Sequence, residues 1–368
     1  MKEKTKYMLG AAAVVLVWAA LVLFCWLRAP DDISESERRK LAQMPELSAG
    51  TLLSGDFMED FESYTLDQFP LRDSFRTLKA VTAYYVFGQK DNNGIYIADG
   101  YAAKLEYPLK ESSVESAADK IEALYNTYMK DTGVKVYVAG IPDKGYFLAE
   151  KNGYPSLDYE RMFEILKEGV PFATYVDITS ALEIEDYYRT DTHWKQTEIV
   201  GVAEILGEAM GIDVPALEDY REVEAGVPFY GVYYGQAALP LASETIEYLT
   251  NDVLDACTVF NVETNKTTGI YDLEKLEGQD PYDVFLSGAA AVLYIENPNA
   301  ATDRELVVFR DSFGSSLVPL LVQNYAKVTL VDTRYVVSDL VGQFVEFDDQ
   351  DVLFMYSALV LNQSAVLR

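Results

Sequence analysis

The pattern of apolar and polar positions begins with one long uncharged run near the N-terminus. Residues 7–27 contain no charged side chain, and three lysines lie within the six residues before them. A helix of this length can cross a hydrocarbon core of about 30 Å. Lysines ahead of such a span place its N-terminus in the cytoplasm and the rest of the chain outside. We therefore expect a cytoplasmic tip and transmembrane signal anchor at residues 1–28.

A cleaved signal peptide is the alternative for this segment. Cleavable peptides usually have a shorter apolar region and end at a site with two small residues. The candidate site here, Leu27-Arg28-Ala29, fits that rule poorly, and Pro30 follows it. In either case the body of the protein is exported. Residues 29–50 are polar and charged, which is typical of a membrane-proximal linker.

The body, residues 51–368, alternates between helical and strand patterns. Apolar residues recur at helical spacing from 51 to 87, with a break expected near Pro70, and a hairpin is expected around Asp99-Gly100. The other expected helices cover residues 112–132, 158–169, 197–211 and 316–326, and the expected buried strands cover residues 134–142, 171–178, 292–297, 306–310, 327–332 and 351–357. Strands that alternate with helices favour an α/β fold with a mostly parallel sheet covered on both faces.

One segment departs from this alternation. Residues 214–281 are rich in Tyr, Thr, Asn and Gly, and they contain no long apolar run. This composition predicts irregular β-structure, so we expect a β-rich insertion within the extracytoplasmic domain.

Charge and cysteine content narrow the classes of function. The net charge of −29, with a pI of about 4.3, would repel phosphate backbones, which argues against nucleic-acid binding. The hydrophobic content of 49% allows a sizeable core. Cys25 lies in the apolar run and Cys257 is alone in the body, so the exported part can form no internal disulfide.

A candidate nucleophile lies in the segment ELVVFRDSFGSSL. Ser312 stands there at the end of an expected strand and the start of an expected helix. Main-chain N–H groups at a helix start lack intrahelical partners and can receive a developing oxyanion. Gly314 would keep the turn tight and admit a substrate close to the backbone. The alternative is structural, because serine is also a favoured N-cap residue.

The base for such a serine could only be His193, the one histidine in the chain. Asp191 lies two residues earlier in RTDTHW, from where its carboxylate can reach the ring and fix its tautomer. A histidine that simply packs beside Trp194 is the alternative. A metal site is disfavoured because there is no second histidine and Cys257 has no partner at ligand spacing.

These segments together resemble a known family. RTDTHW followed by a strand ending in RDSFG is similar to the DHHW proteins and the related alginate O-acetylation proteins, which are exported, SGNH-hydrolase-like acetyltransferases. The resemblance extends over nearly the whole body. It includes SERRKLAQMPELS, FMEDFESYTLDQFPLRDSF, GIPDKGYF, DYYRTDTHW, VPFYGVYYG and VDTRYV. The order, with the Asp-His pair before the serine, is also that of the alginate branch.

The resemblance implies Ser312 as nucleophile, His193 as base and Asp191 as the acid that orients the histidine. The second position of the DHHW motif is Thr192 here. An asparagine expected among the oxyanion donors has no clear counterpart, because Gly288 is followed by Ala289. The expected oxyanion or substrate-binding residues are Gly314, Gly288, Arg334, Tyr335 and Trp194. A plain surface arginine is the alternative for Arg334.

The sequence thus predicts a membrane-anchored extracytoplasmic O-acetyltransferase that needs no cofactor or metal. Its expected acceptor is a cell-envelope or exopolysaccharide glycan. Because acetyl-CoA is absent outside the membrane, a multi-pass membrane acyltransferase is the expected acyl-donor partner. A carbohydrate esterase with the same triad is one alternative. A non-catalytic protein that binds polysaccharide or holds an export complex together is the other.

Overall fold

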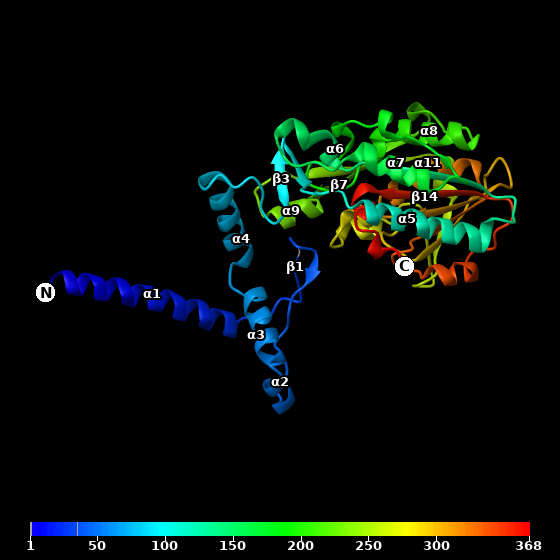
Figure 1. Ribbon diagram of the computed structural model, residues 1–368. Helices are drawn as coiled ribbons and strands as arrows, with labels where there is room; N and C mark the ends of the chain where they lie inside the picture. The colour runs from blue at the N-terminus through cyan, green and yellow to red at the C-terminus, as the bar shows by residue number, and fades with distance from the viewer. Residues whose placement is uncertain (1, 35) are drawn as a thin grey trace. The chain divides into compact units, whose positions relative to one another are not determined.

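The computed structural model describes residues 2–34 and 36–368 and contains two compact units. The first unit is the chain up to Asn92 together with Tyr234–Pro240, and the second is Asn93–Tyr233 together with Leu241–Arg368. The first unit contains α1 (Lys2–Leu27), β1 (Ile33–Ser34), β2 (Arg39–Lys40), α2 (Ala49–Ser54), α3 (Asp56–Asp67), α4 (Arg72–Val81) and a π-helical turn at Thr82–Val86 (Figure 1).

The N-terminal helix α1 matches the predicted span. Its stretch Lys4–Leu27 is long and apolar enough to cross a membrane. The predicted break near Pro70 is confirmed, because α3 ends at Asp67 and α4 begins at Arg72. Leu71 between them has a φ of +56°, which no helix continues through.

The second unit is built on an eight-stranded sheet with the order β10-β9-β11-β13-β12-β14-β5-β6. Its strands are β5 (Lys135–Ile141), β6 (Thr174–Tyr175), β9 (Thr258–Asn261), β10 (Lys266–Thr268), β11 (Val292–Glu296), β12 (Glu305–Arg310), β13 (Lys327–Val331) and β14 (Asp351–Ser357). The five strands from β13 to β6 are parallel, and β11, β9 and β10 are antiparallel. The predicted α/β class with a mostly parallel sheet is confirmed.

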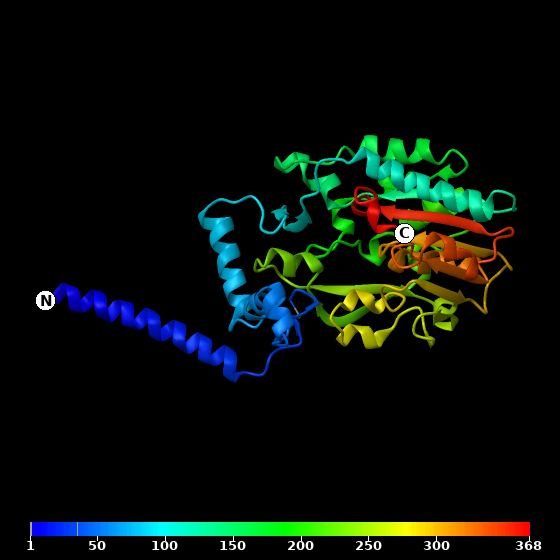
Figure 2. The ribbon, with the colours of Figure 1, turned by 60° about the horizontal axis from the view of Figure 1, so that its bottom comes forward.

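Helices cover both faces of this sheet (Figures 1 and 2). One face packs on α5 (Glu111–Leu124) and α7 (Tyr159–Gly169), and the other on α8 (Val200–Met210) and α11 (Gly314–Leu321). Neighbouring strand residues alternate between these two cores: Val308 and Leu353 face α8 and α11, whereas Val307 and Val352 face α5 and α7. This is why the central strands read as continuous apolar runs.

Several boundaries differ from the predicted ones. The strand expected at 171–178 is only β6, and the helix expected at 112–132 ends as α5 at Leu124, followed by a π-helical turn at Tyr125–Met129. The predicted hairpin is confirmed as β3 (Ile95–Ala98) and β4 (Tyr101–Lys104), with positive φ at Asp99 and Gly100. The short helices are α6 (Lys144–Leu148), α9 (Val232–Ala237), α10 (Asp252–Ala256) and α12 (Ala358–Leu361).

Residues 214–281 hold β7 (Arg221–Phe229), β8 (Glu244–Thr250), β9 and β10. The first two strands pair with each other, and the last two extend the main sheet. Residues 234–240, in the middle of the segment, belong to the first unit. That this segment is an insertion stays a prediction.

Candidate active site

Ser312 lies in the turn between β12 and α11, at the edge of the sheet where the parallel strands end. Asp311 fixes this turn, because one carboxylate oxygen accepts the N–H of Phe313 at 3.0 Å and the other accepts the N–H of Ser357 at 2.8 Å. The turn also requires Gly314: a Cβ there would lie 2.8 Å from the Cβ of Arg310. The serine is thus held by the end of β14 as well as by its own strand.

His193 joins Ser312 to Asp191 in one chain of contacts. Its Nε2 lies 2.7 Å from the hydroxyl of Ser312, and its Nδ1 lies 2.6 Å from Oδ1 of Asp191. The carboxylate of Asp191 is fully buried and accepts two main-chain N–H groups, from His193 at 3.1 Å and from Val232 at 2.7 Å. The structure therefore brings together the three residues that the sequence named as a triad, which lie up to 121 positions apart.

Tyr282, which no sequence motif indicated, holds the imidazole from one face. The two rings stack with centroids 3.9 Å apart and planes 6° apart. The hydroxyl of Tyr282 contacts the hydroxyl of Ser316 at 2.8 Å, which also accepts the indole N–H of Trp194 at 2.9 Å. The ring of His193 therefore has little freedom to rotate away from Ser312.

The segment VPFYGVYYG holds the Asp191 loop from the other side. Gly231 donates its N–H to the hydroxyl of Thr190 at 3.0 Å, and the hydroxyl of Tyr233 lies 3.0 Å from that of Thr192. A Cβ on Gly231 would stand 2.3 Å from the backbone of Asp191, so only glycine allows this approach. The sequence pointed to this segment only as part of the family resemblance.

A buried lysine completes the support of the loop. Lys144 follows β5, and its Nζ donates to the carbonyls of Tyr188 at 2.9 Å and Arg189 at 3.2 Å. Burial lowers the pKa of Lys144 to about 7, although the negative charges of Asp191 and Glu244 act in the opposite direction. Lys144 is therefore a buried titratable group in contact with the segment that leads to Asp191 and His193.

Two predicted oxyanion donors need correction. The N–H of Gly288 already donates to the carbonyl of Phe285 at 3.1 Å, and that of Gly314 donates to the carbonyl of Asp311 at 3.2 Å. Within the described part of the chain, by contrast, no protein acceptor pairs with the main-chain N–H of Ser312. The amide of Ser312 itself is therefore the better placed candidate donor.

The remaining predicted contacts divide into buried and exposed residues. Trp194 is fully buried against Phe313, so it supports the site and cannot face a substrate. Arg334 is paired with the buried Asp332 at 2.6 Å, and its guanidinium lies 5.5 Å from the ring centre of Tyr335. Tyr335 is half exposed and is free to meet a ligand. Among the described residues there is no group of three or more metal-ligating side chains.

Part of the chain matches the model of a known protein family. Residues 172–331, which contain the whole Asp191-to-Ser312 span, match the family model described as DHHW protein. The predicted resemblance to the DHHW family is confirmed. No curated protein matches the chain.

Solved structures share the DHHW-type fold over most of the chain. A DHHW family protein from Eubacterium siraeum superposes with a TM-score of 0.62 at 20% identity, covering 75% of this chain and 94% of that one. PatB1 from Bacillus cereus, solved with a sulfonyl adduct, superposes with a TM-score of 0.57 at 19% identity, covering 73% and 94%. PatB1 solved in a second structure gives a TM-score of 0.54 at 18% identity, covering 73% and 96%. At these identities the likeness establishes a common fold.

Proposed function

We propose that this protein is a membrane-anchored, extracytoplasmic O-acetyltransferase that acylates a cell-envelope or exopolysaccharide glycan. The observation that carries the proposal is the unbroken chain from the Ser312 hydroxyl through His193 to the buried carboxylate of Asp191. A hydroxyl so placed beside an imidazole can be deprotonated as it attacks. Asp191 would hold the Nδ1–H tautomer and stabilise the imidazolium that forms.

The first half-reaction would transfer an acyl group to the protein. Ser312 Oγ attacks the carbonyl carbon of a donor ester, and its proton passes to His193 Nε2. The oxyanion of the tetrahedral intermediate accepts the main-chain N–H of Ser312. The intermediate collapses when the C–O bond to the leaving group breaks, and the imidazolium returns its proton to that leaving oxygen. The donor would be supplied by a multi-pass membrane acyltransferase.

The second half-reaction would reverse these roles. A sugar hydroxyl gives its proton to His193 as it attacks the acyl-enzyme, and Ser312 leaves as the alcohol by taking that proton. If water takes the place of the sugar, the same steps give an esterase. The choice between the two depends on which acceptor reaches the acyl group, so it must be measured.

A sulfonyl fluoride tests the nucleophile directly. PatB1, which shares this fold, has been captured with a sulfonyl adduct, and sulfonyl fluorides modify activated hydroxyl groups. We expect phenylmethylsulfonyl fluoride to add one sulfonyl group to the wild type, which peptide mapping places on Ser312. Ser312→Ala and His193→Ala should lose the adduct, whereas Ser315→Ala, in the same turn, should keep it. An adduct that survives Ser312→Ala would overturn the assignment of the nucleophile.

Transfer and hydrolysis are then separated with an activated acetyl ester and an oligosaccharide acceptor. Acetylated oligosaccharide that depends on Ser312 supports the transferase, and acetate alone supports the esterase. The absence of both, together with the absence of Ser312 labelling, supports a non-catalytic scaffold.

A further inference from the structure

Helix α4 in the first unit buries charged side chains and exposes apolar ones, which is the reverse of an ordinary surface helix. Its basic residues Arg72 and Arg76 face inward, with side chains that are only about one-fifth exposed. Phe75 and Leu78, on the other side, are 45% and 60% exposed. A surface helix normally buries its apolar stripe and presents its charged side to water. The inversion indicates that the apolar side meets something other than water.

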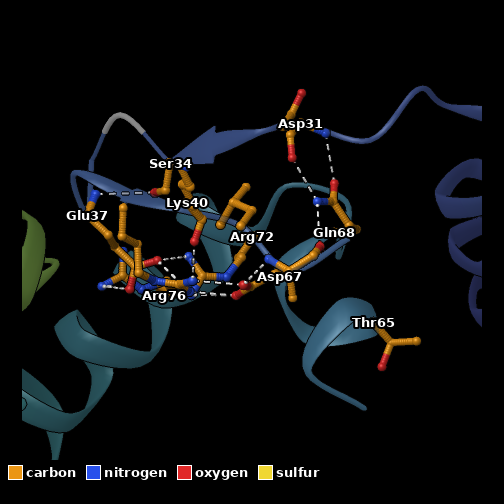
Figure 3. Close-up of polar contacts among 12 residues, drawn as sticks. Asp31, Ser34, Glu37, Lys40, Thr65, Asp67, Gln68, Arg72 and Arg76 are labelled. Atoms are coloured by element: carbon orange, nitrogen blue, oxygen red, sulfur yellow. Dashed lines mark hydrogen bonds and ion pairs between the residues drawn. The ribbon is translucent and has the colours of Figure 1, made fainter. Parts of the chain in front are cut away.

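The inward charges are neutralised within the first unit (Figure 3). Glu37 is paired with Arg72, and also with Arg76 at 3.3 Å. Asp73 supplies a further carboxylate, 3.9 Å from Arg72 and 3.7 Å from Arg76. Asp67 accepts hydrogen bonds from Arg39 at 2.5 and 2.7 Å, and Arg39 lowers the pKa of Asp67 to about 2. No further charged ligand is required on this side. The polar face of α4 is therefore the inner, satisfied face of the unit.

The outward side forms an apolar ridge, which we define as Leu71, Phe75, Leu78, Tyr85 and Val86. Leu71, Tyr85 and Val86 are 65%, 66% and 71% exposed. Phe75 and Leu78 lie three residues apart on α4 and therefore share one side of the helix. Leu71 caps the start of α4, and Tyr85 and Val86 extend the exposed apolar surface into the π-helical turn that follows. Contiguous exposed apolar side chains of this kind mark a protein or membrane contact.

The position of the ridge along the chain indicates which contact. Gln68, three residues before Leu71, is tied to the end of the apolar helix α1 and to the residues that follow it. Its carbonyl accepts the thiol of Cys25 at 3.5 Å, and its side-chain amide exchanges two hydrogen bonds of 2.9 Å with the backbone of Asp31 (Figure 3). Cys25 lies inside the candidate span Lys4–Leu27. The ridge therefore begins where a membrane-spanning α1 would leave the bilayer.

We propose that the apolar ridge of α4 lies on the outer leaflet of the membrane, with its side chains at the boundary between headgroups and acyl chains. Helices of this kind bury an apolar face about 5–10 Å into that boundary. Asp73 at the start of α4 and the net charge of −29 disfavour anionic lipids, so the partner surface is zwitterionic. The inference depends on α1 spanning the membrane and is independent of the acyl-transfer chemistry.

The test places a fluorophore on the ridge of the full chain in lipid nanodiscs. Leu78→Cys, in a Cys25→Ala background, is labelled with the environment-sensitive fluorophore NBD, while Cys257 is buried and stays in place. The matched control is Asp73→Cys on the same helix, at a side chain that is 62% exposed and lies at the rim of the ion pairs of Arg72 and Arg76. The discs contain phosphatidylcholine with or without a spin-labelled lipid that quenches at the headgroup–acyl boundary.

We expect the Leu78 label to emit at a shorter wavelength than the Asp73 label and to be quenched by the spin-labelled lipid. Replacing part of the phosphatidylcholine with phosphatidylglycerol should weaken the quenching. Equal, unquenched emission at both positions would overturn the proposal. A blue-shifted Leu78 label without lipid quenching would also overturn it, in favour of a protein contact. Sulfonyl labelling of Ser312 in the same samples reports folding of the second unit and tests the proposed function separately.

Discussion

The two compact units differ in how they hold their charged groups. In the second unit, the carboxylates of Asp191 and Asp311 are buried and accept main-chain N–H groups. In the first unit, Glu37 is paired with the long side chains of Arg72 and Arg76. Asp67 is paired with that of Arg39 and accepts one main-chain N–H, from Ala42 at 2.9 Å. A charge held by the backbone is fixed in position, as proton transfer requires. A charge held by long side chains can change its position, which would suit the proposed contact of α4 with a membrane.

The largest expected effect comes from Asp191, a carboxylate that the backbone holds. Asp191→Asn keeps an oxygen for the N–H of Val232 but removes the acceptor that selects the Nδ1–H tautomer of His193. We expect the rate of Ser312 sulfonylation to fall by ~10³–10⁴-fold with little change in stability. The rate is measured by intact-mass spectrometry over time. Asp177→Asn, on an exposed loop, is the control, and equal rates in the two variants would show that Asp191 has no role.

The backbone support of Asp191 can be broken without touching a charge. Gly231→Ala would place a Cβ 2.3 Å from the Asp191 backbone, so the loop must move. Such overpacking typically destabilises by about 1–3 kcal/mol, and a shift of about 1 Å in the triad can lower the rate ~10²-fold. Thermal unfolding and the sulfonylation rate measure the two effects. Gly201→Ala in α8 has an open position, with its nearest neighbour 3.8 Å away. It should leave the sulfonylation rate unchanged and raise the stability by up to about 1 kcal/mol.

The buried Lys144 makes the free energy of unfolding of the second unit depend on pH. With a pKa of about 7 in the folded state and 10.5 as its ordinary value, Lys144 binds fewer protons folded than unfolded between these limits. Its contribution to the free energy of unfolding therefore rises with pH across this window. Relative to wild type, Lys144→Met should lose about 2 kcal/mol between pH 6.5 and pH 9.

Urea unfolding at both pH values measures this change. The loss of the two hydrogen bonds to Tyr188 and Arg189 lowers the stability at both pH values, so it does not affect the difference between them. Lys167→Met, at an exposed lysine, is subtracted to remove the general effect of losing one positive charge. A pH-independent difference after that subtraction would contradict the lowered pKa.

The smallest expected effect belongs to the side-chain network of the first unit. Glu37→Gln removes the carboxylate that faces Arg72 and Arg76, and partly exposed ion pairs of this kind contribute about 1 kcal/mol or less. We expect hydrogen exchange of the α4 amides to quicken by up to about fivefold. Glu59→Gln, at an exposed acidic position of α3, should leave it unchanged. If Glu37→Gln lowered the free energy of unfolding as much as Gly231→Ala does, the proposed difference between the two units would be wrong.

The sequence predicted the strands, and the proximity of Ser312, His193 and Asp191, better than it predicted their surroundings. Buried parallel strands are apolar throughout, so their runs are easy to recognise, and Ser312 and His193 stand in motifs with a clear chemical use. Tyr282 lies in a segment that no motif marks. Gly231 and Lys144 lie in VPFYGVYYG and GIPDKGYF, which belong to the family resemblance but indicate no role for either residue. Gly288 was considered as an oxyanion or substrate-binding residue only through the family resemblance, and Gly314 because a glycine admits a substrate close to the backbone. The N–H groups of both are occupied within their own turns.

In the first unit the helical spacing of α4 was predicted, but the side of the helix that is buried was not. The apolar recurrence through Phe75 and Leu78 indicates an amphipathic helix without saying which side is buried. The usual assumption places apolar side chains inside. It fails for α4 because the inner side is occupied by the carboxylates of Glu37 and Asp67, which lie 35 and 5 positions before Arg72.

Helix α9 has a practical consequence for how the protein can be shortened. Its first residue, Val232, donates to Asp191, while the carbonyls of Gly235 and Ala237 in its last turn accept from Arg76 and Asn92, each at 2.8 Å. A soluble version that starts at residue 93, the natural boundary of the sheet unit, would leave both carbonyls without these donors within two turns of the triad. Shortened proteins for crystallography or inhibitor screening should therefore begin before α4 and carry polar replacements on its apolar ridge.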